Sequence, residues 1–243
     1  KHLASWGAGD VTEPHGLKVV GDTVYTTDRS DSVAKSFSLD GKVKLALGTK
    51  GQHSDTGTVT NWLVERAAGP FNHPTEMLPH PNGDIYVSDG YRNARIHRFS
   101  ADGKLKVSWG APGSAPGQFH LPHSSACDDD GNLLVSDRSN RRIQILTPDG
   151  AYLGDLLARF RGMVMFAGGG NIGIYPDNAH LRATVIAQLR PRHRCLVFSQ
   201  SALAPEAALV RPQVTVWCRD AVSRALLQGS TDGGWGGNAE SNT

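Results

Sequence analysis

Length, composition and charge place this chain among ordinary globular proteins. Its 243 residues are 39% hydrophobic and 20% charged, which is enough to bury one large all-β domain or two small ones. The 25 Lys and Arg residues nearly balance the 23 Asp and Glu residues, and a formal net charge of +2 favours neither a nucleic-acid nor a membrane partner. No apolar run approaches the ~18 residues of a membrane span, and three cysteines without Cys-x-x-Cys spacing predict no disulfide framework.

An internal repeat organises the first two thirds of the chain. Three copies align, spanning Glu13–Gly48, Asn72–Gly110 and Leu121–Leu156. In each copy an apolar stretch ends in an aspartate, namely Asp28, Asp89 and Asp137. The last two aspartates are 48 residues apart, whereas the segment Thr49–Phe71 is inserted between the first two copies. A period of ~40 to 50 residues with four short strands in each unit is typical of a β-propeller.

Each copy predicts short antiparallel strands. The stretches "GDTVYTTD", "GDIYVSDG" and "GNLLVSDR" are apolar or β-branched runs that follow a Gly-polar turn. An Asp-Gly pair at residues 40–41, 102–103 and 149–150 joins two alternating runs in each copy and is a strong signal for a β-hairpin. No convincing helical period occurs before Leu156. The opening "LASWG" matches "KVSWG" at Lys106–Gly110, so we expect the chain to start in an incomplete blade.

The segment after Leu156 has a different composition. All lysines precede Val107, yet Arg159–Thr243 carries nine arginines and lacks the repeat. We therefore expect propeller blades at residues 1–158 and a divergent or disrupted C-terminal segment at residues 159–243. Within that segment "SALAPEAALV" and "RDAVSRALLQ" favour short helices, "PQVTVWCRD" is similar to a stray blade strand, and "STDGGWGGNAESNT" is predicted to be disordered. The hypothesis is a truncated or frame-shifted remnant of further blades.

Repeat position predicts which side chains converge. The innermost strand of every propeller blade lines one central channel, so equivalent positions on different blades point toward a common axis. His15 and His123 precede their repeat aspartates by 13 and 14 residues and thus occupy equivalent positions. Because neutral imidazole is the commonest transition-metal ligand, both are candidate ligands of one cation. The second copy has Thr75 at this position, with His73 two residues earlier.

The repeats resemble a known family. The pattern Pro-x-x-x, Asp-Gly-x-x-x-Val-x-Asp and Asn-x-Arg-Ile resembles the NHL repeats of β-propellers. More narrowly, "PHGL", "SDGYRNARIHRFS", "SWGAPGSAPGQFHLPHS" and "SDRSNRRIQ" resemble peptidyl-α-hydroxyglycine α-amidating lyase and its bacterial relatives, over residues 1 to 156. The resemblance implies an all-β, NHL-type β-propeller of a six-bladed family, incomplete here, with an irregular C-terminal tail.

The resemblance also implies an active site. In this family three histidines hold a catalytic zinc ion, with a tyrosine and an arginine close by. The matching residues are His15 and His123 for the metal, Tyr91 for the tyrosine and Arg138 for the arginine. The family also implies a structural calcium ion.

Two features depart from the family pattern. A third Pro-His pair is missing, because His180 and His193 lack the repeat around them. Arg92 replaces the family's cysteine after the tyrosine, so that disulfide is absent.

The implied reaction breaks the bond between nitrogen and a hydroxylated α-carbon and yields a peptide amide and glyoxylate. Zinc with an open coordination position would bind the hydroxyl and lower its pKa. Tyr91 is the candidate general base, and Arg138 would hold the substrate carboxylate or stabilise developing negative charge. The expected partner is a peptide or a small-molecule substrate.

Two other functions stay open on the sequence. A non-catalytic NHL propeller, or a fragment of one, that binds a peptide or protein partner fits the missing third histidine, because an unclosed propeller cannot preorganise a central site. A calcium-dependent lactonase would need acidic and Asn ligands on the axis, where this chain has His and Thr.

Several of these residues also have a purely structural interpretation. The Asp-Arg steps at Arg29 and Arg138 are consistent with interblade ion pairs. Asp89 and Asp137 are expected to cap turns or to pair with Arg95 and Arg142.

Overall fold

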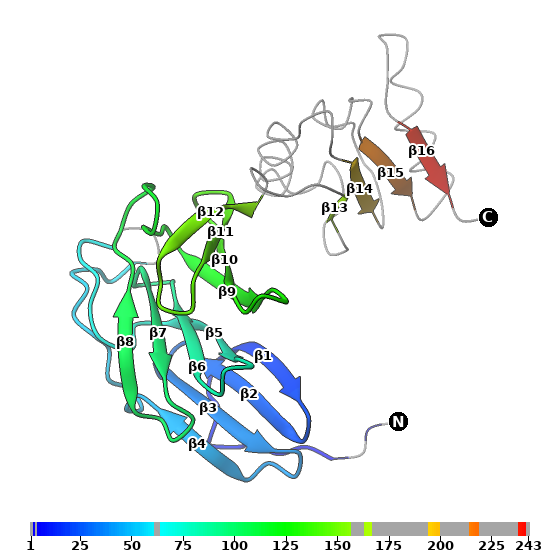
Figure 1. Cartoon of the computed structure of the whole chain (residues 1–243). Coiled ribbons are helices and arrows are strands. Elements are labelled where there is room, and N and C mark those ends of the chain that lie inside the picture. The colour runs from blue at the N-terminus through cyan, green and yellow to red at the C-terminus, as the bar shows by residue number, and fades with distance from the viewer. Residues whose placement is uncertain are drawn as a thin grey trace. The chain divides into compact units, whose positions relative to one another are not determined.

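The computed structural model describes residues 2, 4–60 and 64–156, together with four short strands nearer the C-terminus (Figure 1). The chain divides into two compact units, Lys1–Leu156 and Leu157–Thr243, and each is described by itself. All regular elements among the described residues are strands. In that part of the chain no helix has the length and apolar character needed to cross a bilayer.

The first unit consists of three four-stranded antiparallel sheets, one for each copy of the repeat. The first sheet contains β1 (Pro14–Val20), β2 (Thr23–Asp28), β3 (Val33–Ser38) and β4 (Val43–Leu47). The second contains β5 (Pro74–Pro79), β6 (Ile85–Asp89), β7 (Arg95–Phe99) and β8 (Leu105–Trp109). The third contains β9 (Pro122–Cys127), β10 (Leu133–Asp137), β11 (Arg142–Leu146) and β12 (Tyr152–Asp155). Strands follow chain order within each sheet, which confirms the predicted all-β propeller blades.

The three predicted Asp-Gly hairpins close the outer strand pair of each blade. Gly41, Gly103 and Gly150 adopt φ values of +87°, +89° and +90°, which only glycine reaches without strain. In each turn the glycine N–H donates to the carbonyl three residues earlier. The Asp-Gly signal therefore located these turns because the backbone needs glycine there.

The repeat aspartates fix the loop that leads into the first strand of each blade. Asp28, Asp89 and Asp137 are all buried. Their carboxylates accept backbone N–H groups of that loop, from Thr12 and Glu13 in the first blade, Asn72 in the second and His120 in the third. The predicted capping role of Asp89 and Asp137 is thus confirmed, and Asp28 makes the same kind of contact in the first blade.

The predicted ion pairs of these aspartates form in one blade only. Arg142 Nε lies 2.9 Å from Asp137 Oδ2. In the second blade Asp89 instead contacts His97 Nε2 at 3.2 Å, and both side chains are fully buried. Arg95 donates to the carbonyl of Ser108, so its expected pairing with Asp89 was wrong. In the third blade Gln144 stands at the strand position of His97, and Asp137 accepts hydrogen bonds from both Gln144 and Arg142.

The blades pack face to face through two apolar clusters. The cluster between the first and second blades comprises Ala34, Leu47, Phe71, Met77, Ile85, Val87 and Phe99. The cluster between the second and third comprises Leu78, Tyr86, Ala94, Ile96, Phe119, Leu133, Val135 and Leu146. Strand β5 contacts β1 and β2 on one side and β9 on the other, so the first strands of the three blades are neighbours. These first strands, β1, β5 and β9, are the inner strands of the three blades.

The second unit contains a parallel sheet of four short strands. They are β13 (Met163–Phe166), β14 (Arg194–Ser199), β15 (Val214–Cys218) and β16 (Asn238–Ser241), paired in chain order. Strand β15 falls in "PQVTVWCRD" as predicted, but its parallel pairing differs from the antiparallel pairing of a blade. Strand β16 lies within the stretch expected to be disordered. The two segments expected to be helical lie outside the described residues.

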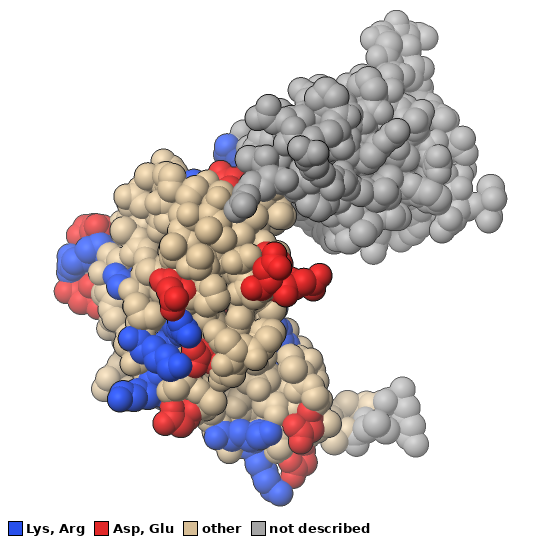
Figure 2. All heavy atoms as spheres, in the orientation of Figure 1, with Lys and Arg blue, Asp and Glu red and all other residues tan. Residues whose placement is uncertain are grey.

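Charged side chains of both signs are interspersed over the face of the blades seen in Figure 2. This distribution agrees with the small net charge of the chain.

Candidate functional site

A β-bulge recurs at the same place on all three inner strands. The pairing register shifts between Pro14 and Leu17 in β1, between Pro74 and Glu76 in β5, and opposite the Ser136–Asp137 step in β9. The residues at these irregular positions include His15, Thr75 and His123. A bulge bends its strand and re-aims the side chain, which explains how local structure turns these residues toward the neighbouring blades.

The structure brings His15, Tyr91 and His123 together from three different blades. The Tyr91 hydroxyl lies 3.1 Å from His15 Nε2 and 3.2 Å from His123 Nε2. The centroids of the two imidazole rings are 4.8 Å apart, and each ring meets the tyrosine ring edge to face. Equivalent repeat positions therefore converge, as the sequence predicts.

Hydrogen bonding sets the protonation of this cluster. His15 Nδ1 lies 2.8 Å from the Thr75 carbonyl oxygen, which can only accept, so His15 carries its proton on Nδ1 and presents a lone pair at Nε2. A phenol has one proton, which Tyr91 can donate to His15. His123 Nε2 can then donate its own proton to the Tyr91 oxygen. The result is a chain of hydrogen bonds from the third blade to the second and on to the first.

His123 is held in its neutral form. Burial, followed by the nearby charges of His15 and Arg138, lowers its pKa from 6.5 to about 4. A neutral imidazole is the form that binds a metal ion or accepts a proton. The Arg138 side chain is exposed, and its effect on His123 places its charge near the cluster.

Arg29 is a member of this site that the sequence analysis treated only as a structural residue. Its guanidinium carbon lies 5.0 Å from the centre of the Tyr91 ring, and its other partner is Glu13. The pKa of Arg29 is raised, first by the hydrogen bond to Glu13 and also by the interaction with Tyr91. The sequence contained a signal for this role, because Arg29 directly follows its repeat aspartate just as Arg138, the candidate active-site arginine, does.

Close backbone contact between inner strands holds the cluster in place. A Cβ atom on Gly16 would lie 2.5 Å from the Thr75 carbonyl oxygen, and one on Gly90 would lie 2.1 Å from the Pro122 carbonyl oxygen. The Thr75 hydroxyl also lies 2.9 Å from the Pro122 oxygen. Glycine at both positions is therefore needed for the blades to approach this closely.

The remaining histidines of the blades lie elsewhere. His73 is buried beside His53, with its Nδ1 3.1 Å from the Asn72 side-chain oxygen. His97 bridges Ser108 and Asp89 inside the second blade. This Ser-His-Asp arrangement is a buried structural network, because the carboxylate and the imidazole are both fully enclosed.

The cluster fits part of a zinc site. It offers two imidazoles, one with its tautomer fixed by a backbone carbonyl, as is usual for metal-binding histidines. Within the described residues no group of three His, Cys, Asp or Glu side chains could hold a metal ion. His180 and His193 lie outside the described residues. The described blades thus offer two imidazoles at this place, whereas a catalytic zinc ion usually has three protein ligands.

Comparisons with known proteins agree with the repeat pattern. No protein-family model matches the chain. Human NHL repeat-containing protein 3 is 30% identical over 197 residues, covering 77% of this chain and 52% of its own length. A probable peptidyl-alpha-hydroxyglycine alpha-amidating lyase of Caenorhabditis elegans is 32% identical over 149 residues, covering 59% and 39%. Peptidyl-glycine alpha-amidating monooxygenase B of Xenopus laevis is 44% identical over 151 residues, covering 59% and 16%.

Solved structures give a weaker likeness. Virginiamycin B lyase from Staphylococcus aureus has a TM-score of 0.40 and 17% identity over 58% of this chain and 40% of its own. The chain spans about half the length of NHL repeat-containing protein 3 and less of the amidating proteins.

Proposed function

We propose that this chain, an NHL-repeat propeller protein homologous to the amidating lyases, cleaves C-terminal α-hydroxyglycine residues to a peptide amide and glyoxylate. One observation carries the proposal, namely the joining of His15, Tyr91 and His123 from three blades in one hydrogen-bonded cluster. Relatives named as amidating proteins align over 56–60% of the chain, which supports the same assignment.

His15 and His123 are the proposed zinc ligands, through their Nε2 atoms. When bound, zinc supplies Lewis-acid polarisation of the substrate hydroxyl and lowers the pKa of that hydroxyl. The third protein ligand must come from outside the described residues. The proposed structural calcium ion has no assigned ligands.

Tyr91 is the proposed general base. Its hydroxyl lies 3.1 and 3.2 Å from the two Nε2 atoms that would hold zinc, so a cation held there would favour loss of the phenol proton to solvent, and the phenolate can accept the proton of the substrate hydroxyl. The electron pair of that O–H bond then forms the carbonyl of glyoxylate while the C–N bond breaks and the departing nitrogen takes up a proton. The Arg29 guanidinium above the ring stabilises the negative phenolate.

Arg138 is the proposed ligand of the substrate carboxylate. Its guanidinium is exposed, so it can meet a solvent-borne anion, and its charge acts on His123. A bidentate guanidinium–carboxylate pair would fix the orientation of the hydroxyglycine against Tyr91.

A second candidate is a non-catalytic propeller that binds a peptide or a protein partner. One observation favours it, because the described blades supply only two imidazoles at the cluster.

Metal content and product release test the proposal together. The full chain and its His15→Ala, His123→Ala and Tyr91→Phe variants are dialysed against metal-free buffer, analysed for zinc, and assayed for glyoxylate release from N-benzoyl-α-hydroxyglycine. His2→Ala is the matched control, because His2 is exposed and remote from the cluster in sequence.

The proposal expects about one zinc ion per chain in the parent, His2→Ala and Tyr91→Phe proteins and its loss from the other two. It expects Tyr91→Phe to lower glyoxylate release at least ~100-fold with zinc retained. A parent protein that binds no zinc and releases no glyoxylate would overturn the lyase assignment and favour the non-catalytic propeller.

A further inference from the structure

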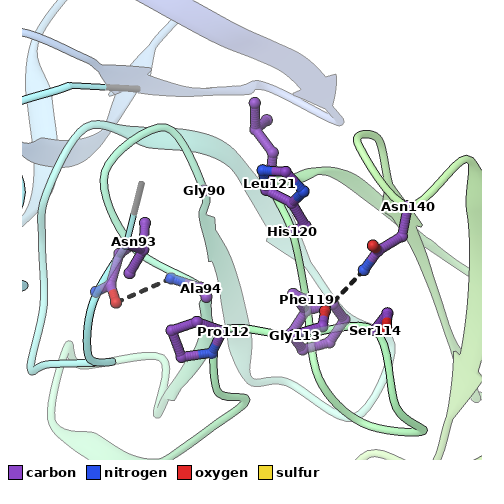
Figure 3. A pocket seen from close by; sticks show the side chains of 11 residues that line it. Gly90, Asn93, Ala94, Pro112, Gly113, Ser114, Phe119, His120, Leu121 and Asn140 are labelled. Carbon is purple, nitrogen blue, oxygen red and sulfur yellow. Dashed lines mark hydrogen bonds between the residues drawn. The ribbon is translucent and has the colours of Figure 1, made fainter. Parts of the chain in front are cut away.

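A cavity of about 340 Å³ lies between the second and third blades (Figure 3). Its walls come from the β6–β7 loop with Gly90 and Ala94, the β8–β9 loop with Phe119 and Leu121, and the β10–β11 loop with Asn140. In an up-and-down sheet alternate connections lie at the same end of the strands. The three loops therefore share one end of the blades, and Tyr91 belongs to the first of them.

The cavity begins next to the histidine–tyrosine cluster. Gly90 directly precedes Tyr91, and Leu121 lies two residues before His123. Consecutive Cα atoms are 3.8 Å apart, so the Cα atoms of Tyr91 and His123 lie within about 4 and 8 Å of the Cα atoms of these two wall residues. An extended peptide that rises ~3.3 Å per residue spans the same distance in one or two residues.

The floor of the cavity is apolar. Ala94, Phe119 and Leu121 are 1%, 1% and 2% exposed, and Val64 and Pro112 complete the apolar wall. The volume falls in the range of small-ligand sites, which are mostly apolar with a few placed polar groups. This lining suits an aromatic or large aliphatic side chain and offers no cation to hold a charged one.

The rim of the cavity is polar and offers a peptide acceptor. Asn140 donates both of its amide hydrogens, to the Gly113 carbonyl and to Asp137, each at 2.8 Å. Its side-chain oxygen stays available to accept a peptide N–H. Ser114 and His120, both labelled among the lining residues in Figure 3, are exposed and belong to this rim.

We propose that this cavity binds the apolar side chain of the residue that precedes α-hydroxyglycine in a peptide substrate. This inference rests on the proposed function, because it places the hydroxyglycine at Tyr91 and the preceding residue at the blade junction. The Asn140 side-chain oxygen accepts the N–H of that preceding residue. Peptides with Phe or Leu before the hydroxyglycine are then preferred over peptides with Ala or Asp.

Product amides test the cavity without requiring catalysis. The probes are acetyl-Ala-Phe-NH2 and acetyl-Ala-Ala-NH2, titrated calorimetrically into the full chain. Ser114→Trp fills the cavity from its exposed rim, and Ala101→Trp is the matched control because Ala101 is an exposed small residue in the β7–β8 turn. Glyoxylate release is measured in parallel on the corresponding peptides extended by α-hydroxyglycine.

The parent protein and Ala101→Trp should bind the Phe amide at least about tenfold more tightly than the Ala amide, and Ser114→Trp should reduce that ratio to about threefold or less. Equal binding of the two amides, or an unchanged ratio in Ser114→Trp, overturns the cavity assignment. Glyoxylate release with no preference for Phe also overturns it while leaving the lyase intact. A Phe preference that Ser114→Trp removes, without any glyoxylate release, supports the cavity and overturns the lyase.

Discussion

Replacing Gly90 by alanine should damage both stability and the site, because Gly90 lies where two blades meet. The added Cβ atom would stand 2.1 Å from the Pro122 carbonyl oxygen and 2.9 Å from the carbonyl carbon. Both are backbone atoms, so no side chain can rotate away. Ordinary contact needs more than 3 Å, and the third blade must therefore retreat by about 1 Å.

That retreat has a calculable effect on two observables. Overpacking of this kind costs about 1–3 kcal/mol in the free energy of unfolding, which corresponds to a fall of roughly 2–12 °C in Tm for a unit of this size. The distance from Tyr91 to His123 is 3.2 Å, and a further ~1 Å takes it beyond hydrogen-bonding range. We therefore expect Gly90→Ala to lose the shared cluster before it loses the fold.

Gly69→Ala is the matched control, because a Cβ atom there meets nothing within 4 Å and the backbone is not in the left-handed region. Calorimetry gives Tm, and histidine ring NMR reports whether His15 and His123 still share Tyr91. If Gly90→Ala matched Gly69→Ala in both measurements, the close approach of the inner strands would not be what builds the cluster.

Three further substitutions test the same framework by denaturant unfolding. Burial, followed by the charge of Arg92, lowers the pKa of His73 from 6.5 to about 4. The free energy of unfolding is therefore unaffected by this group above pH 6.5 and falls as the pH drops from 6.5 toward 4. The total loss is at most about 3 kcal/mol. His73→Asn, which tolerates the local φ of +61°, should remove that part of the acid sensitivity, and an unchanged pH profile would contradict it. Asp137→Ala removes the carboxylate partner of the Arg142 guanidinium and should lower the free energy of unfolding by about 3 kcal/mol or more. A loss below about 1 kcal/mol would mean that water replaces the carboxylate as the partner of Arg142. Thr75→Val removes a hydroxyl shared by two backbone carbonyls and should cost about 1–2 kcal/mol, with the exposed Thr49→Val neutral; equal values for both would refute the interblade hydrogen bond.

The blades could be predicted from the sequence because their turns need particular residues and because the repeat recurs along the chain. The Asp-Gly turns depend on one residue's access to positive φ, and all three were predicted. The meeting of His15 and His123 followed from their similar spacing to the repeat aspartates, since equivalent positions in different propeller blades point toward a common axis. The role of each residue in that cluster stays a prediction.

Features that depend on tertiary contacts were less accessible. Arg29 lies over the Tyr91 ring of the neighbouring blade, whereas the sequence alone suggested only an interblade ion pair for this residue. Asp89 contacts His97 and not Arg95, a choice between two side chains of one strand that the strand pattern does not reveal. The parallel pairing of β13 to β16 is non-local, so the composition of the tail predicted a break in the repeat but not the new sheet.

The histidine–tyrosine cluster contains one side chain from each of three blades. Ligand binding at the cluster is therefore coupled to the packing of the three blades against one another. A ligand that contacts all three side chains can bind only while the blades are packed together, so it stabilises the native state. Its contribution grows as RT ln(1 + [L]/Kd), which reaches about 2.7 kcal/mol at a hundredfold excess over Kd. The Tm of this protein should therefore rise with the concentration of any ligand that binds at the histidine–tyrosine cluster, so Tm measured against ligand concentration reports on binding there.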